Sequence, residues 1–159
     1  MIITFKTDLT VEETMVFERI YPGDLQETIE SKQDTLDSGL GVWMYANGEL
    51  AGETYGMPAW MIDPIDDAEA RQDITDDLLG SFYVSSTTIL SKFQGGGLGK
   101  ILKSYLLGYI KGIGYKISTG HATSVPMFKI NKDLGAQFLV THDGWYGTKK
   151  IAYFCKIEL

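Results

Sequence analysis

Two periods of hydrophobic and polar positions run along the chain, and together they predict strands interleaved with helices. Strands are predicted at residues 3–7, 42–46, 50–56, 82–90, 115–123, 137–142 and 151–159. Helices are predicted at residues 11–21, 25–37, 98–113 and 125–135. Asn47-Gly48, between two apolar runs, indicates a hairpin because this dipeptide fits the tightest two-residue turns. The order is typical of a mixed α/β (α+β) chain with antiparallel hairpins, and it argues against a doubly wound parallel fold.

The ends of the predicted helices carry signals of their own. Thr10 and Glu13 have the spacing of a capping box at the start of the first helix. Pro22-Gly23 would end that helix, and Asp24 can cap the next one. The helix over 98–113 is the most regular, with apolar side chains on one face and lysines on the other.

Composition indicates the class of protein. The chain has 159 residues, 44% of them hydrophobic and 22% charged, which is the length and balance of one globular domain over residues 1–159. No run approaches the ~20 apolar residues of a membrane-spanning helix, and the N-terminus does not resemble a secretory signal. A single cysteine, Cys155, and the absence of zinc-type Cys/His spacing predict no internal disulfide and no metal. We therefore expect a cytoplasmic protein without membrane association.

Charge is divided unevenly along the chain. Residues 1–77 hold 18 acidic and 4 basic side chains, whereas residues 78–159 hold 3 acidic and 10 basic ones. The acidic half favours a cationic partner, or simply solubility, and it disfavours nucleic acid, whose binding depends on neutralising phosphates. The basic half suits an anion such as a phosphorylated cofactor.

A glycine-rich loop indicates chemistry most directly. A strand ends near residue 90 and a helix begins near residue 98, and four glycines fall at this junction within five positions: Gly95, Gly96, Gly97 and Gly99. Glycine lets the backbone turn its N–H groups toward a ligand, and the first turn of a helix adds unpaired donors and partial positive charge. Lys92 and Lys100 flank the loop. The arrangement predicts a phosphate or pyrophosphate site.

The spacing of the loop distinguishes between known phosphate-binding patterns. A Walker loop fails because Gln94 stands where its first glycine belongs and Ile101 replaces its serine or threonine. A dinucleotide loop fails because Lys100 stands at its third glycine. The pattern that fits is Q-x-x-G-x-G, from Gln94 to Gly99, after a strand. It resembles the acetyl-CoA pyrophosphate loop of the GNAT superfamily of N-acetyltransferases.

The resemblance extends beyond the loop. Residues 89–94 follow the family's strand-to-loop frame with Ser91 in place of a proline, and residues 127–136, MFKINKDLGA, resemble a second family signature. The match covers roughly residues 40–159. It implies a GNAT-like central sheet of seven mostly antiparallel strands, flanked by about four helices, in which the parallel strands near 82–90 and 115–122 splay apart.

The resemblance also implies a co-substrate. In the family, acetyl-CoA lies along the strand before the loop, binds the loop through its pyrophosphate, and gives its acetyl group directly to an amine without a metal or an acyl-enzyme. The residues carried over to the cofactor are Thr87, Thr88, Ile89, Gln94, Gly95, Gly96, Gly97, Leu98, Gly99, Lys100, Ser124 and Asn131.

The usual acid and base of the family are absent from their usual places. Asn131 replaces the common donor tyrosine, and Tyr83 and Thr119 stand where members place a glutamate. The remaining catalytic candidates are Tyr83, Glu53 and His121. Tyr83 would bind the amine or relay its proton, Glu53 would act as a base through water, and His121 would accept a proton. The competing interpretations are a packed tyrosine, a solvated hairpin carboxylate and a structural histidine.

An acidic segment before the fourth strand suggests the class of acceptor. Its carboxylates are Asp63, Asp66, Asp67, Glu69, Asp73, Asp76 and Asp77. In the family such an insert borders the acceptor site, so we expect a cationic amine: a small amine, a polyamine, an aminoglycoside-like amine or a lysine side chain. Met57, Trp60 and Met61 would line that site or cover the core. Tyr146 and Tyr153 are further candidates for a proton donor, and Cys155 is expected in the core.

Two other functions stay open. A non-catalytic acyl-CoA-binding module would keep the cofactor loop without the chemistry, and the missing tyrosine and glutamate favour it. A nucleotide-binding domain outside the family would bind ATP or NAD instead. Family members often pair through edge strands, which makes a homodimer an option.

Overall fold

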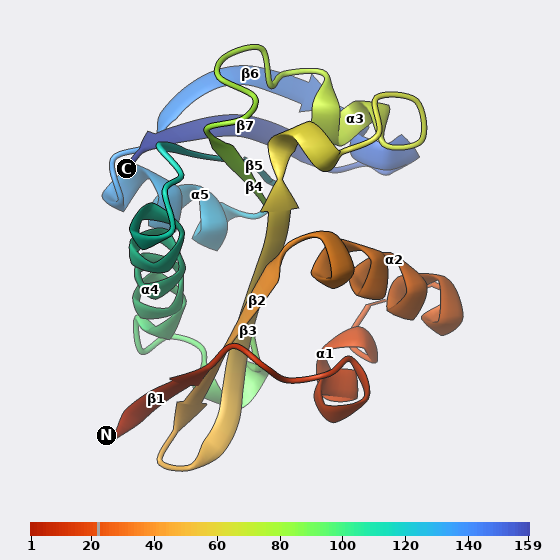
Figure 1. Ribbon diagram of the computed structural model, residues 1–159. Helices are drawn as coiled ribbons and strands as arrows, with labels where there is room; N and C mark the ends of the chain where they lie inside the picture. The colour runs from red at the N-terminus through yellow and green to blue at the C-terminus, as the bar shows by residue number, and fades with distance from the viewer. Residues whose placement is uncertain (22) are drawn as a thin grey trace. The chain divides into compact units, whose positions relative to one another are not determined.

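A computed structural model describes residues 1–21 and 23–159, so the helix end predicted at Pro22 lies outside the described residues. The chain divides into two compact units, and Figure 1 colours them by position along the chain. Unit 1 comprises Met1–Gly56 and Ser86–Leu106, and unit 2 comprises Met57–Ser85 and Leu107–Leu159.

The strands form a mixed sheet. They are β1 (Ile3–Lys6), β2 (Leu40–Ala46), β3 (Glu49–Pro58), β4 (Ser81–Ile89), β5 (Ile117–Ala122), β6 (Gln137–Asp143) and β7 (Ile151–Glu158). Their order by hydrogen bonding is β1-β2-β3-β4-β5-β7-β6. β1–β2, β2–β3, β5–β7 and β6–β7 are antiparallel, whereas β4 and β5 are parallel. The predicted seven strands and the parallel pair are therefore confirmed.

Three of the four predicted helices are confirmed; the helix over 11–21 differs, and a short helix over 68–71 lies where the sequence predicts a loop. They are α1 (Met15–Glu18), α2 (Leu25–Ser38), α3 (Ala68–Arg71), α4 (Leu98–Gly112) and α5 (Val125–Asp133). Asp24 caps α2 as predicted, since its carboxylate accepts the backbone N–H groups of Gln26 and Glu27. No helix in the described part of the chain is long and apolar enough to cross a bilayer.

The exception is the helix predicted over residues 11–21. The capping box forms, because the Thr10 N–H donates to Glu13 and the Glu13 N–H donates to the Thr10 hydroxyl. The segment nevertheless begins as a 3-10 helix, and α1 ends at Glu18. The next N–H groups bond three residues back, from Ile20 to Phe17 and from Tyr21 to Glu18, which tightens the chain out of α geometry.

The predicted hairpin between β2 and β3 is confirmed. Asn47 and Gly48 have φ angles of 51° and 82°, and positive φ at both central residues is what the favoured two-residue hairpin turn requires.

α2 and the first turns of α4 lie on opposite sides of β2 and β3 (Figure 1), so the alternation of side chains along these strands decides which helix each side chain meets. Trp43 lies opposite Glu53 on one face of the two strands. There Glu53 accepts hydrogen bonds from Lys32 of α2 and from the Trp43 indole. The other face meets the first turns of α4, where Phe5 of β1 stacks on Tyr105 with ring centroids 3.9 Å apart. Period two along the strands therefore separates a charged helix face from an aromatic one.

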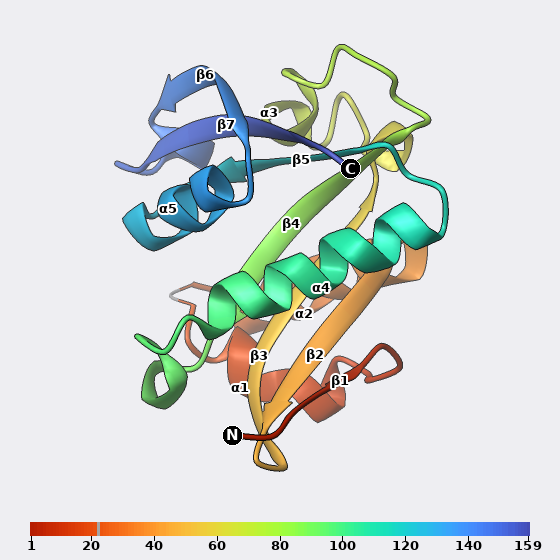
Figure 2. The same cartoon turned by 90° about the vertical axis from the view of Figure 1, so that its left-hand side faces the viewer.

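Unit 2 has its own two faces. α5 packs against β5, β7 and β6 on one of them (Figure 2), where the Phe128 ring stacks on Phe138 at 4.2 Å and meets Tyr153 at 5.0 Å. A second cluster of buried apolar side chains gathers around Tyr83 and Phe154 and consists of Ala59, Ile62, Ala70, Ile74, Tyr83 and Phe154. Cys155 is buried, as expected.

Candidate functional site

The glycine loop joins β4 to α4 within unit 1. Gln94 folds back, and its side-chain amide donates to the Ile89 carbonyl at 2.8 Å. Gly95 and Gly97 have φ angles of +85° and +76°, in the left-handed region where only glycine is unstrained. The Gly97 carbonyl then accepts the backbone N–H of Lys100 at 3.1 Å, which starts the first turn of α4.

Backbone N–H groups of this loop have no acceptor within the described part of the chain. Among the described residues, none of the five N–H groups over residues 95–99 donates to another atom of the chain. They lie at the start of a 15-residue helix, whose first turn carries partial positive charge. Lys92 stands beside the loop in an exposed ion pair with Glu49. Several aligned N–H donors with this electrostatic sign are what a pyrophosphate needs.

The end of β4 brings the other predicted cofactor residues up to the loop. The Thr87 hydroxyl lies 2.9 Å from that of Thr54, and the Thr88 hydroxyl lies 2.8 Å from that of Tyr21. These side chains are half-buried, and Ile89 holds Gln94 as described above. Their contact with a cofactor stays a prediction.

Glu53 lies in a buried ion network of unit 1 and not on a solvated hairpin. The Lys32 ammonium lies 2.7 Å from Glu18 Oε1 and 2.7 Å from Glu53 Oε2. The ammonium also donates to the Thr14 hydroxyl at 2.9 Å, and the Trp43 indole N–H donates to Glu53 Oε2 at 3.0 Å. All five side chains are buried. We call this set the Lys32 network.

Two carboxylates in the Lys32 network face one ammonium. Glu18 Oε2 and Glu53 Oε1 are buried, and neither has a hydrogen-bond partner among the described residues. Burial, opposed by the Lys32 charge, raises the pKa of Glu53 from 4.5 to about 7. Burial also raises the pKa of Tyr55, whose ring lies 5.5 Å from the ammonium. These contacts give Glu53 a structural role, and its role as a base stays a prediction.

One face of the unit 2 sheet collects the remaining catalytic candidates. Tyr83 ends the parallel ladder of β4 with β5, opposite the residue two before His121. His121 lies opposite Phe154 of β7, and Ala152, two residues before Phe154, lies opposite His142 of β6. Because side chains alternate with period two, Tyr83, His121 and His142 share one face.

These side chains form a continuous chain of hydrogen bonds with Asp73. The Tyr83 hydroxyl lies 2.9 Å from His121 Nδ1, and His121 Nε2 lies 2.8 Å from Asp73 Oδ2. His142 Nε2 lies 2.6 Å from the same Asp73 oxygen. The His121 and Asp73 side chains are nearly buried, whereas 24% of the His142 side chain is exposed. We call Tyr83, His121, Asp73 and His142 the His121 cluster.

The partners of His121 fix its hydrogen positions. A carboxylate only accepts, so Nε2 carries the hydrogen that Asp73 accepts, and Nδ1 accepts from the Tyr83 hydroxyl. Burial lowers the pKa of His121, against the attraction of Asp73, and burial raises the pKa of Tyr83 well above its ordinary value. Trp145 and Phe154 pack on the imidazole with ring centroids 4.1 and 5.0 Å away, which holds its plane.

The His121 cluster also contains one group of metal-ligand type. In the described part of the chain, the donor atoms of Asp73, His121 and His142 lie within 4.8 Å of one another. Ligands about 2.1 Å from a tetrahedral zinc would stand roughly 3.4 Å apart. The facing atoms lie at 2.6 and 2.8 Å and are hydrogen-bonded. The absence of a metal stays a prediction.

Compared by sequence, the chain matches no protein-family model and no curated protein. Its fold matches solved structures. An agmatine N-acetyltransferase is 13% identical over 99% of this chain and 100% of that chain, with a TM-score of 0.75. The ribosomal-protein-S18-alanine N-acetyltransferase of Escherichia coli is 12% identical over 99% and 94%, with a TM-score of 0.73. A GNAT family acetyltransferase from Elizabethkingia anophelis with acetyl-CoA bound is 14% identical over 99% and 98%, with a TM-score of 0.69.

The chain has the GNAT fold. The fold expected from the glycine loop and the second signature is therefore confirmed.

Two predicted cofactor residues of this GNAT fold already have partners inside the chain. Ser124 is the N-cap of α5, where its hydroxyl accepts the Met127 N–H at 3.3 Å. Asn131, at the position of the family's donor tyrosine, is buried, and its amide donates to Cys155 Sγ at 3.2 Å. Asn131 Oδ1 has no hydrogen-bond partner among the described residues. Their cofactor contacts stay predictions.

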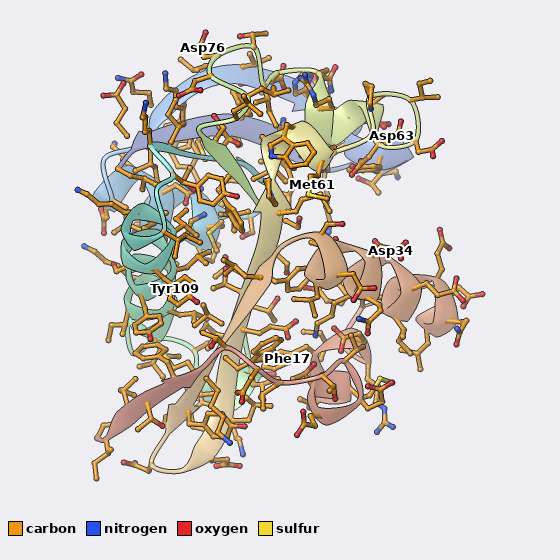
Figure 3. All side chains as sticks on the ribbon, viewed as in Figure 1. Phe17, Asp34, Met61, Asp63, Asp76 and Tyr109 are labelled. Atoms are coloured by element: carbon orange, nitrogen blue, oxygen red, sulfur yellow. The ribbon has the colours of Figure 1, made fainter. Side chains whose placement is uncertain are left out.

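The acidic insert of unit 2 divides into exposed carboxylates and one that is nearly buried. Asp63 and Asp76, labelled in Figure 3, are exposed; Asp63 accepts the N–H groups of Ile65 and Asp66, and Asp76 lies 3.4 Å from the Lys156 ammonium. Asp73 is not a surface charge, because it is committed to the two histidines. Other members also have local partners; Asp67, for example, accepts the hydroxyl of Tyr146.

The apolar residues next to the insert also divide into exposed and packed side chains. Trp60 and Met61 are exposed, whereas Met57 packs against the buried apolar cluster. Tyr153 packs on Phe128, on the α5 face.

Sequence reasoning missed two members of the His121 cluster. In the sequence, Asp73 is only one charge of an acidic run, and His142 is only the last residue of a predicted strand. The chain contains two histidines, and their small number is the one signal in the sequence that could have suggested a common partner. The deciding facts, however, are that β7 lies between β5 and β6 and that a bulge shifts the register within β6, and neither is visible in the sequence.

Proposed function

We propose that the chain is an N-acetyltransferase that moves an acetyl group from acetyl-CoA directly to a primary amine. The observation that supports this most is the row of N–H groups over residues 95–99 at the start of α4, which have no acceptor within the described part of the chain, because a pyrophosphate needs such donors. The likeness to a GNAT acetyltransferase with acetyl-CoA bound supports it from the side of the fold. The residues that would hold acetyl-CoA are those predicted at 87–89, 94–100, 124 and 131.

The chemistry requires an ammonium to lose two protons before an amide results. Acetyl-CoA supplies an activated acetyl group, whose C–S bond breaks as the C–N bond forms, and the thiolate takes one of those protons. We assign the other proton to Tyr83 and His121, because the Tyr83 hydroxyl already donates to His121 Nδ1. Tyr83 stands at the last residue pair of the parallel ladder, the strand pair between which the family resemblance implies the thioester.

The proposal also names the chemical class of the acceptor, a cationic amine. The support is the acidic insert, of which Asp63, Asp66, Glu69 and Asp76 are exposed. One fold neighbour is an agmatine N-acetyltransferase, but another is a ribosomal-protein-alanine N-acetyltransferase, so the neighbours differ in acceptor. The quadruple variant D63N/D66N/E69Q/D76N should raise the KM for agmatine or spermidine and leave the KM for acetyl-CoA unchanged. An unchanged acceptor KM would refute the cationic class.

One observation favours the alternative of a non-catalytic acyl-CoA-binding module. Asn131 occupies the place of the family's donor tyrosine and is buried against Cys155, so no phenol stands there to protonate the leaving thiolate. Such a module would bind acetyl-CoA and release no thiol with any amine.

Turnover tests the proposal directly. Release of free thiol from acetyl-CoA should depend on an added amine, in a panel of agmatine, spermidine and a lysine-containing peptide. Gly97→Ala should weaken acetyl-CoA binding about tenfold or more, because it disturbs the aligned donors. Gly114→Ala, at another glycine with positive φ, is the control for backbone strain alone. Equal effects of the two variants would refute the loop assignment.

The remaining expectations stay proposals as well. They are a single functional domain, a cytoplasmic location, no nucleic-acid partner and an optional homodimer.

A further inference from the structure

We infer that Asp73 and His142 are positioning residues for proton transfer, and that they act through His121 on Tyr83. The inference rests on the proposed function, since it gives the His121 cluster the task of accepting the proton that the acceptor amine loses. Tyr83 is then the catalytic residue that touches the amine, and the other three side chains never do.

The hydrogen bonds of His121 have a fixed order of donors and acceptors. Asp73 Oδ2 accepts the Nε2 hydrogen of His121, which leaves the Nδ1 lone pair pointing at the Tyr83 hydroxyl 2.9 Å away. The opposite tautomer would put two lone pairs face to face at the carboxylate. Asp73 thus sets the direction in which a proton can move, from Tyr83 toward His121, as the carboxylate of a hydroxyl–imidazole–carboxylate triad does.

His142 holds Asp73 in place. Asp73 comes from the loop before β4, and a loop carboxylate would otherwise be free to turn toward water. His142, on β6, donates to the same oxygen at 2.6 Å. The imidazoles of His121 and His142 therefore share one acceptor, and the charge of His142 lowers the pKa of His121.

The proton balance is closed by these groups. An amine proton moves to the Tyr83 oxygen as the Tyr83 hydrogen moves to His121 Nδ1, so tyrosine stays neutral throughout. His121 becomes an imidazolium, whose Nε2 keeps its hydrogen and still donates it to Asp73. Asp73 is not protonated, and the imidazolium returns its proton to water after the amide has formed.

Other charged groups near the cluster set the background of any pH measurement. Asp67 faces both His121 and Tyr83, and Tyr146 and Cys155 face Tyr83. Burial and His142 lower the pKa of His121, whereas Asp73 and Asp67 raise it. Variants at Asp73 and at His142 should therefore move the titration of His121 in opposite directions.

The primary experiment is long-range ¹H–¹⁵N NMR of the imidazoles in the whole protein. The chain has two histidines, so two spin systems are expected, and His142→Gln identifies that of His121. We expect His121 as the neutral Nε2–H tautomer. Its titration should shift to lower pH in Asp73→Asn, because the carboxylate that favours the imidazolium is gone, and to higher pH in His142→Leu. An Nδ1–H tautomer, or shifts in the same direction, would overturn the inference.

The second experiment is the pH profile of kcat with the best amine. Asp73→Asn should lower kcat about 100-fold with little change in the KM for acetyl-CoA, the size expected for loss of an effective proton acceptor. His142→Leu should lower kcat and move the acid limb to higher pH. His142→Gln, which keeps an N–H donor for Asp73, should recover most of the loss. Asp143→Asn, an exposed carboxylate next to His142, is the control and should leave kcat unchanged.

The two proposals fail in different ways. If the protein binds acetyl-CoA but turns over no amine, the proposed function fails while the NMR result still stands as a test of the hydrogen-bond order. If turnover is normal in Asp73→Asn and its acid limb does not move, the inference fails and the acetyltransferase remains.

Discussion

The buried Lys32 network makes a quantitative prediction about stability and pH. One Glu53 oxygen accepts hydrogen bonds from Lys32 and Trp43, and the other has no partner among the described residues. Glu18 already neutralises the same ammonium. The perturbation is Glu53→Gln, which keeps the shape and the acceptor for Lys32 and removes the titration.

The magnitude follows from the pKa of this carboxyl. Burial raises it from 4.5 to about 7 in the folded chain, and in the unfolded chain it returns to its ordinary value. A raised pKa means that the contribution of Glu53 to stability is fully present below about pH 4.5 and is lost as the pH rises through about 7. Each tenfold change in proton affinity corresponds to about 1.4 kcal/mol, so the loss amounts to about 3 kcal/mol.

The assay is urea unfolding at several pH values between about 4 and 8.5, monitored by tryptophan fluorescence. The quantity is the difference in the free energy of unfolding between the native sequence and Glu53→Gln, because titrating groups that do not interact with Glu53 cancel in it. The native sequence should lose about 3 kcal/mol relative to the variant as the pH rises. Glu49→Gln, an exposed glutamate on the same strand, is the matched control and should show no such trend.

A constant difference across this range, within about 0.5 kcal/mol, would refute the reasoning. It would mean that Glu53 is ionised at both ends of the range, and that Lys32 compensates both carboxylates.

Three further predictions follow from the same contacts. Lys32→Met should cost about 3–5 kcal/mol of unfolding free energy, because it leaves two carboxylates buried without a cation; Lys92→Met, in an exposed pair, should change it by less than about 1 kcal/mol. Glu18→Gln should lower the pH at which Glu53 titrates, since a neighbouring charge is removed, and the urea series above would detect this as a weaker slope. Dialysis against EDTA should leave turnover and the tautomer of His121 unchanged; recovery of lost activity by Zn²⁺ would contradict the hydrogen-bonded interpretation of Asp73.

Local signals in the sequence predicted much of the fold. Asn47-Gly48, Asp24 and the apolar spacing over 98–113 each act over a few residues, and the hairpin, the cap and α4 follow them. The glycine loop is also a local signal, because the spacing of its residues in the sequence is enough to indicate the phosphate site. The first helix is shorter than predicted, because the N–H groups of Ile20 and Tyr21 bond to carbonyls three residues back and not four. No pattern in the sequence indicates that these bonds form.

The catalytic candidates show where such reasoning ends. Glu53 looked like a solvated hairpin carboxylate, and only the packing of α2 against β3 reveals Lys32 beside it. Asp73 and His142 are 69 residues apart in the chain yet share one hydrogen bond, which depends on the strand order and on a bulge in β6. Long-range register of this kind is not encoded in any short pattern.

The central claim is that the row of N–H groups over residues 95–99 binds the pyrophosphate of acetyl-CoA, and calorimetric titration tests it most directly. Purified protein should bind acetyl-CoA saturably, neither ATP nor NAD should compete, and Gly97→Ala should weaken the affinity while Gly114→Ala does not. Absence of binding, or equal binding of ATP or NAD, would contradict the assignment of the loop and with it the acetyltransferase.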